Sequence, residues 1–583
     1  MRRCPFLAIA ALAVFLSACG SEATSVAGSG GSGGNDSARG PVVDTDSGPV
    51  AGVENDGVIS YRGIPYAAPP VGDLRWQPPV DPSRWADVLQ ATEKPSICPQ
   101  ESFAGLPVPG FMPSEDCLYL NVDAPVEGSD LPVMVWIHGG GFTLGEGVQT
   151  DGGTAGDLIA REAGLVVVSM NYRLGQLGFL AHAALSDESA DGASGNYGLM
   201  DQAAALRWVR QNIAAFGGDP TNVTIFGESA GAFSVCSHLA STSSAGLFEK
   251  AILQSGSCER PWPTLAAAEA QGTAFAAALG CDSEDDVLGC MRAKSADEVL
   301  AALPPAPNFG FSPSDEASGR WGPVFDGFFF AEQPRDSFVS GEFNQVPTLI
   351  GFTREEARLF VWLGQISDPP LEVTADNYIS LIAYFLGGDQ ELAASAAEEY
   401  PLEDYAEPAL ALAAVATDMI FRCPGKLEAT KLSGYVPTHL YQFEYPDGHS
   451  QLEVALPFIG ASLPSYDLAA FHGSDIPYVF GYDPLLEIDF ENFATTLNSW
   501  APDTRDEALW LEMLGYFARF AASGDPNVEG AVDWPVYDPE TDRHLVLDAE
   551  PSLGENAAPN CTFWEGEDYL VPELSLEPLL SLQ

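Results

Sequence analysis

Short apolar runs recur along this chain, and stretches with a helical pattern separate them. Each run is rich in aliphatic and β-branched residues and lacks polar alternation, which is typical of strands covered on both faces. The runs are residues 133–137, 166–170, 223–226, 251–253, 346–352 and 440–443. The clearest helical pattern spans residues 199–216, with Asn196 as a candidate cap. This alternation predicts an α/β domain with a central, mostly parallel sheet flanked by helices.

The segment from residue 41 to residue 583 contains no second linker and no internal repeat. We therefore predict that residues 41–583 form one domain. Within it, residues 265–305 and 375–420 are rich in Ala, Leu and Glu. They are predicted to be helical and to form a cap layer over the sheet.

The N-terminus has the pattern of an export signal. Arg2 and Arg3 precede the apolar residues 5–16, as in a signal peptide. The following Leu-Ser-Ala-Cys sequence resembles a bacterial lipoprotein box, which implies a signal peptide over residues 1–18 and lipidation of Cys19. An ordinary signal peptide with a chance cysteine is the alternative.

Residues 19–40 are mostly Gly, Ser and Ala and are predicted to be a flexible linker. Gly20 rather than Asp follows the cysteine, so by resemblance to other lipoproteins we expect an outer-membrane or cell-surface location. The membrane is thus an expected partner, through the lipid anchor.

The charge balance excludes one class of partner. The chain has 25 Lys and Arg against 82 Asp and Glu, a net charge of −57, which repels nucleic-acid phosphates. The acid excess fits saline or acidic surroundings and lineage-wide composition drift equally well. No C-x-x-C and no cluster of His, Asp and Glu at ligand spacing occurs, so no metal site is expected.

A G-x-S-x-G sequence spans Gly227 to Gly231, with Ser229 at its centre. The apolar run 223–226 precedes it, and an apolar helical stretch follows. Two glycines allow a turn so tight that the serine is held exposed on a strained backbone at the start of a helix. A plain turn of small residues is the alternative. The context favours a nucleophilic serine.

A serine nucleophile needs a histidine base and an acid that orients it. The histidines that follow Ser229 are His238, His439, His449, His472 and His544. His238 lies within the helix that follows the nucleophile, where it points the wrong way, whereas His472 lies in a glycine-flanked loop suited to presenting a side chain. A structural role for His472 stays open on this evidence.

The acid should follow a strand, and Glu355 and Glu356 directly follow the predicted strand ending near residue 353. Their position favours one of them over Asp326 or Asp418 without choosing between the two. Upstream, His138 is followed by Gly139, Gly140 and Gly141. Such a glycine run leaves backbone N–H groups bare, as an oxyanion hole requires.

Taken together, these motifs resemble the type-B carboxylesterase/lipase family, which includes the cholinesterases and the fungal lipases. The resemblance covers roughly residues 41 to 565. Its motifs are residues 61–67, 114–122, 171–175, 216–231 and 254–256.

The resemblance implies an α/β-hydrolase fold, no cofactor, and a set of site residues. The family's acid lies in an Asp-Glu-Gly stretch, which here reads Glu355-Glu356-Ala357. The implied roles are Ser229 as nucleophile, His472 as general base, Glu356 as orienting acid, and the N–H groups of Gly140, Gly141 and Ala230 as oxyanion donors.

The resemblance also implies the disulfides Cys98–Cys117, Cys281–Cys290 and Cys423–Cys561. It leaves Cys236 and Cys258 without a partner, and we expect Cys236 to pack as a free thiol.

The implied activity is hydrolysis of carboxylic esters of small to medium size through an acyl-enzyme. A lipase acting on long-chain acylglycerols is the first alternative. A non-catalytic adhesion module is a remote alternative: related adhesion proteins have lost the catalytic serine or other triad members, whereas this chain keeps the triad residues and the glycine loop. The loop from Cys98 to Cys117 contains Phe103 and Phe111 but no tryptophan, so a choline ester is not expected; this loop is also a candidate flap over the site.

Overall fold

The computed structural model describes residues 39–100, 113–148, 154–305, 319–367, 370–446, 466–481 and 504–565. These described residues all belong to one compact unit. Several predictions lie outside the described residues: the signal peptide, Cys19, nearly all of the linker, Phe103, Phe111 and His449.

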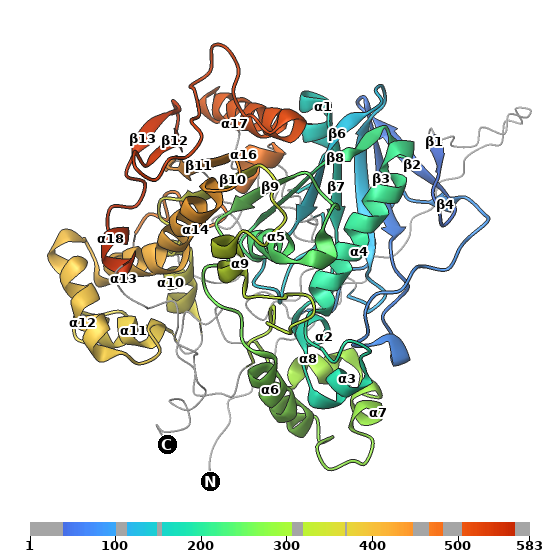
Figure 1. The fold of residues 1–583 in the computed structure, drawn as a ribbon, viewed down its shortest axis with the longest axis horizontal. Coiled ribbons are helices and arrows are strands. Elements are labelled where there is room, and N and C mark those ends of the chain that lie inside the picture. The colour runs from blue at the N-terminus through green and yellow to red at the C-terminus, as the bar shows by residue number, and fades with distance from the viewer. Residues whose placement is uncertain are drawn as a thin grey trace, which may run out of the picture. The chain divides into compact units, whose positions relative to one another are not determined.

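A single sheet runs through this unit in the order β1-β2-β3-β5-β7-β6-β8-β9-β10-β11-β12-β13, with β4 paired to β2 (Figure 1). Neighbours from β7 to β12 in this order pair in parallel. Antiparallel strands flank this parallel block on both sides. The strands are β1 Arg39–Asp44, β2 Pro49–Asn55, β3 Val58–Pro65, β4 Leu89–Gln90, β5 Tyr119–Pro125, β6 Leu131–Ile137, β7 Val166–Met170, β8 Gly218–Glu228, β9 Lys250–Gln254, β10 Thr348–Thr353, β11 Thr438–Phe443, β12 Arg543–Leu547 and β13 Ser552–Glu555.

All six apolar runs are strands of the parallel block, as predicted. Every residue of β7, β9, β10 and β11 is buried, which explains why these runs lack polar alternation.

Helices lie between successive strands from β6 to β12. The helices are α1 Asp157–Ala163, α2 Gly175–Phe179, α3 Ala183–Glu188, α4 Tyr197–Asn212, α5 Ala230–Ala240, α6 Leu265–Ala278, α7 Val287–Arg292, α8 Ala296–Ala301, α9 Pro334–Ser340, α10 Arg358–Ile366, α11 Tyr378–Phe385, α12 Gln390–Glu399, α13 Pro408–Thr417, α14 Cys423–Ser433, α16 Ile476–Phe480, α17 Thr504–Ser523 and α18 Cys561–Glu565.

Two faces of the sheet have separate apolar cores, and β6 contributes to both. Val133, Val135 and Ile137 belong to the cluster that includes residues of α4 and α5, whereas Met134 and Trp136 belong to the cluster that includes residues of α1, α16 and α17. This division follows from the alternation of side chains along a strand. Helices therefore cover both faces (Figure 1).

The two regions predicted as a cap layer are helical. Residues 265–305 form α6, α7 and α8, and residues 375–420 form α11, α12 and α13. The second group packs with α10 and α18 around an apolar core of its own. A π-helix over Asp418–Arg422 continues α13 directly into α14.

Asn196 precedes α4, but its side chain does not cap the helix. Its amide donates to the backbone oxygen of Val324 and its oxygen accepts from the Val324 N–H. α4 begins at Tyr197 and ends at Asn212, and a 3₁₀ turn over Ile213–Phe216 completes the predicted span.

The three disulfides implied by the resemblance, Cys98–Cys117, Cys281–Cys290 and Cys423–Cys561, are all present. The expectation of a free thiol at Cys236 is wrong, because Cys236 forms a fourth disulfide with Cys258. Cys236 lies on α5 and Cys258 follows β9. These elements pack together and bring the two Cα atoms to 5.9 Å, within the usual range for a disulfide.

Candidate active site

The G-x-S-x-G segment forms the turn between β8 and α5, and its glycines are required by close packing. A Cβ atom at Gly231 would lie 1.9 Å from the backbone oxygen of Ile137, and one at Gly227 would lie 2.7 Å from the same oxygen. Ser229 between them has φ 55° and ψ −121°, a conformation that L-residues rarely adopt. The predicted strained turn is therefore present.

The glycine run after β6 lies directly beside this turn. A Cβ at Gly139 would lie 3.2 Å from the Ser229 Cβ and 2.9 Å from Oε2 of Glu228. Gly140 and Gly141 have φ values of 99° and 61°, so their peptides take orientations that other residues resist.

His138 fixes the start of this glycine loop. Its Nδ1 lies 2.9 Å from the Gly139 oxygen, and its own backbone oxygen accepts from the Tyr172 hydroxyl at 2.8 Å. The Tyr172 ring also stacks on the imidazole. Burial lowers the pKa of His138 to about 4, so this ring is neutral and serves as a fixed support.

The structure brings Glu356 and His472 together. Nδ1 of His472 donates to Oε2 of Glu356 at 2.7 Å, while Oε1 of Glu356 accepts from the Thr353 N–H at 2.8 Å. The Glu356 side chain is fully buried. Glu355 instead pairs with Arg354, so of the two candidate glutamates it is Glu356 that contacts His472.

The other acids and histidines considered for these roles have different hydrogen-bond or ion-pair partners. Asp326 accepts from the N–H groups of the turn that follows it, and Asp418 pairs with Arg422. His238 is bonded to Gln202 and Ser244, and His439 contacts the Pro535 oxygen. His544 contacts the Asp542 oxygen.

On its other side, His472 faces a carboxyl group that the sequence reasoning missed. Nε2 lies 3.1 Å from Oε1 of Glu228, the residue that precedes the serine in the motif. Among the residues that the structure describes, Nε2 has no hydrogen-bond partner, so no hydrogen bond joins it to Ser229. The signal that could have identified Glu228 is its place at the buried end of β8, next to the serine.

Two aromatic rings pack against the imidazole. The centroids of Phe360 and Phe421 each lie 4.8 Å from that of His472. Phe360 is on α10, which follows Glu356, and Phe421 is in the π-helix. The rings shield the Glu356–His472 hydrogen bond from water, which strengthens it.

Electrostatics around His472 are dominated by buried acids. Burial raises the pKa of Glu228 to about 8. For His472, burial favours the neutral form, but the carboxylates of Glu228, Glu356 and Asp475 outweigh it and raise the pKa to about 9. Asp475 is itself buried and accepts from Gln254 and Tyr441. This network stabilises an imidazolium.

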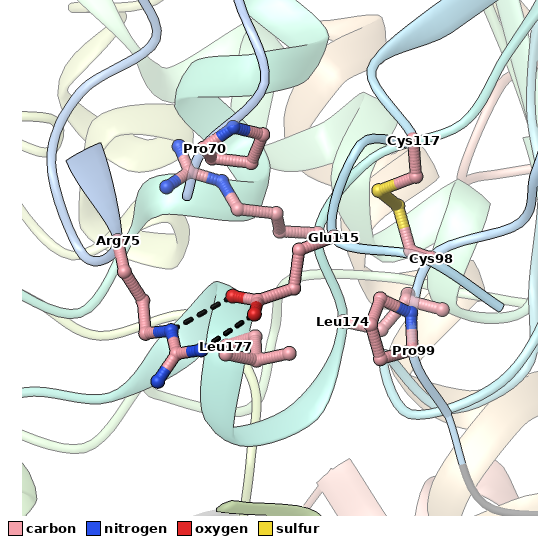
Figure 2. A pocket seen from close by; sticks show the side chains of 9 residues that line it. Pro70, Arg75, Cys98, Pro99, Glu115, Cys117, Leu174 and Leu177 are labelled. Carbon is pink, nitrogen blue, oxygen red and sulfur yellow. Dashed lines mark hydrogen bonds and ion pairs between the residues drawn. A yellow bond between two sulfur atoms is a disulfide. The ribbon is translucent and has the colours of Figure 1, made fainter. Parts of the chain in front are cut away.

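A separate small pocket lies beside the first disulfide and contains none of these residues (Figure 2). Figure 2 shows the guanidinium of Arg75 facing the carboxylate of Glu115, with contacts of 2.8 and 2.5 Å. Arg173, also in the lining, is paired with Asp201. Because these charges neutralise one another, the pocket is a packing feature next to Cys98–Cys117.

In the described part of the chain, no group of His, Cys, Asp and Glu is arranged to hold a metal ion, and none of the described helices has the length and apolar character of a membrane span. What the geometry does offer is a strained serine, a glycine loop beside it, and a histidine hydrogen-bonded to a buried glutamate. This combination is suited to acyl transfer.

Comparison with known proteins agrees with this chemistry. The model of the carboxylesterase family matches residues 39–564. The para-nitrobenzyl esterase of Bacillus subtilis is 37% identical over 522 residues, covering 88% of this chain and 96% of that protein. An acylcarnitine hydrolase of Mus musculus is 36% identical over 530 residues, covering 87% and 86%.

Among solved structures, a PNB esterase superposes with a TM-score of 0.72 at 35% identity, covering 91% of this chain and 99% of that one. A thermophilic PNB esterase gives the same TM-score at 33% identity and the same coverage. The chain belongs to the carboxylesterase family and is an α/β-hydrolase that hydrolyses carboxylic esters.

Proposed function

We propose that Ser229 is the nucleophile of this esterase, with His472 as its general base and Glu356 as the orienting acid. The observation that carries the assignment is the 2.7 Å hydrogen bond between Nδ1 of His472 and buried Glu356, in a site that also contains the strained Ser229. The N–H groups of Gly140, Gly141 and Ala230 are the proposed oxyanion donors.

In this mechanism Oγ of Ser229 attacks the ester carbonyl carbon while Nε2 of His472 accepts the hydroxyl proton. The carbonyl oxygen becomes an oxyanion held by the backbone N–H groups. The C–O bond then breaks, and the alcohol leaves with the proton from His472. Water attacks the acyl-enzyme by the same route and releases the acid and the free serine.

The proposed substrates are esters of small to medium size. The named relatives are esterases of a nitrobenzyl ester and of acylcarnitines. A series of p-nitrophenyl esters from acetate to palmitate separates this proposal from a long-chain lipase, which would prefer the palmitate ester.

Labelling with a fluorophosphonate tests the nucleophile. The wild-type protein should be labelled at Ser229, and Ser229→Ala should lose both the label and nearly all p-nitrophenyl butyrate hydrolysis, by about 10³-fold or more. Hydrolysis unchanged in Ser229→Ala would refute the assignment. A wild-type protein that neither labels nor hydrolyses any ester of the series would favour the adhesion module.

We also propose that the protein is exported and anchored through a lipid on Cys19. The four disulfides support export, since such bonds persist in oxidising compartments. Radiolabelled palmitate should be incorporated by the full chain in a bacterial host but not by Cys19→Ala, whose export by an unaltered signal serves as the control. Equal incorporation by both would contradict the anchor.

A further inference from the structure

The Cys236–Cys258 disulfide lies behind the proposed nucleophile. Cys236 is about two turns further along the helix that Ser229 begins, and Cys258 lies in the segment that follows β9. Neither cysteine has any exposed surface. The bridge therefore ties the helix of the nucleophile to the end of the neighbouring strand.

The segment between β9 and Cys258 is in direct contact with Ser229. The Ser229 N–H donates to the Gln254 oxygen at 2.9 Å. A Cβ at Gly256 would lie 2.9 Å from the backbone oxygen of Ser229 and 2.8 Å from the Cβ of Ala232. This segment is thus the support on which the strained serine rests.

The same segment is attached to the part of the fold that carries the acid. The Ser255 N–H donates to the Gly351 oxygen of β10 at 2.8 Å, and β10 leads to Glu356. At its other end, the Cys258 N–H donates to Oε2 of Glu428 at 2.6 Å. Glu428 lies on α14 and is fully buried.

A serine with positive φ keeps its conformation only where its surroundings hold it. We propose that the Cys236–Cys258 disulfide is a positioning element of the active site: it holds residues 254–258 against Ser229 and so fixes the nucleophile relative to His472. This inference rests on the proposed role of Ser229, and it goes beyond stabilisation of the fold.

The test compares two double variants, Cys236→Ala with Cys258→Ala, and Cys281→Ala with Cys290→Ala. The second pair removes the bridge between the segment that follows α6 and α7. At a temperature where circular dichroism shows both variants folded, we measure kcat and KM for p-nitrophenyl butyrate and the rate of fluorophosphonate labelling.

In the first variant, kcat and the labelling rate should fall at least about tenfold with KM within about twofold, because small displacements of a reacting atom are costly. The control should lose thermal stability only. A folded first variant that keeps kcat and the labelling rate within about twofold would overturn the proposal.

If the first variant does not fold, variants of Glu428 test the proposal instead. Glu428→Ala keeps the disulfide but removes the acceptor for the Cys258 N–H, whereas Glu428→Gln keeps an acceptor oxygen. We expect a lower kcat in Glu428→Ala and recovery in Glu428→Gln, and equal kcat in the two would refute positioning through this segment. Labelling of the wild-type protein at Ser229 is scored separately, so failure of the proposed nucleophile is recognised independently.

Discussion

Replacing Glu228 by glutamine removes the negative charge nearest to Nε2 of His472 and keeps the shape of the side chain. The two atoms lie 3.1 Å apart. At an effective dielectric constant of about 20, the attraction at this distance has an upper bound of about 5 kcal/mol. Observed effects of a nearby opposite charge are smaller and correspond to about 1 to 3 pH units.

The direction of the shift in the pH profile follows from the protonation state of His472 that catalysis requires. The base must be neutral, and the surrounding carboxylates raise the pKa of His472, so the acid limb of the activity profile should lie at higher pH than for an ordinary histidine. Without the Glu228 charge, neutral His472 forms at lower pH. The acid limb of kcat/KM in Glu228→Gln should therefore move down by about 1 to 3 pH units, with a lower plateau because a weaker base remains.

The assay is kcat/KM for p-nitrophenyl butyrate from pH 5 to pH 10, corrected for spontaneous hydrolysis. The matched control is Glu355→Gln, which removes a carboxylate paired with Arg354 and should leave the midpoint in place. Because Glu228 and His472 interact strongly, the wild-type midpoint belongs to the pair. A midpoint in Glu228→Gln that stays or moves to higher pH would refute the reasoning.

Three further changes test the surrounding structure. Gly231→Ala puts a Cβ 1.9 Å from the Ile137 oxygen, so kcat should fall about 100-fold or more; activity near wild type would contradict the close packing of the turn. Burial raises the pKa of Glu428 well above 4.5, so the folded state binds this proton more tightly, and the free energy of unfolding falls as pH rises above that value, by up to about 1.4 kcal/mol per pH unit. Glu428→Gln should flatten this part of the Tm profile, and an unchanged slope would contradict the shift. Replacing Cys423 and Cys561 by alanine opens a bridge across a separation of 138 residues and should lower the free energy of unfolding by about 4 to 5 kcal/mol, measured by urea titration; a loss under about 1 kcal/mol would not fit.

The parallel strands were predictable because burial on both faces leaves an unbroken apolar run, as in residues 166–170. The glycine loop and the turn at Ser229 were predictable because the close packing there admits only glycine, and the glycines can be read directly from the sequence. The choice between Glu355 and Glu356 came from the family resemblance. Position after the strand could not decide it, because the partner of each depends on tertiary packing.

Other features depend on contacts between distant segments. The Cys236–Cys258 bridge was missed because a spacing along the chain does not reveal that α5 packs on β9. Glu228 was missed because the motif leaves that position unspecified. Its carboxyl group meets the His472 ring only in the folded chain, since the two residues are far apart in the sequence. Asn196 was expected to cap α4, but its side chain makes two hydrogen bonds to the backbone of Val324 instead, a contact that the sequence does not reveal.

The π-helix over Asp418–Arg422 is a place where the chain can change length without moving its neighbours. A π-turn holds about one residue more than an α-turn, so the segment accommodates one extra residue within a continuous helix. Deleting one residue there would let the helix become regular while Cys423 and Glu428 stay on the same face of α14. The change would be local, at Phe421 and its contact with His472. Related chains should therefore differ by a single residue in length at this segment more readily than elsewhere in α13 and α14.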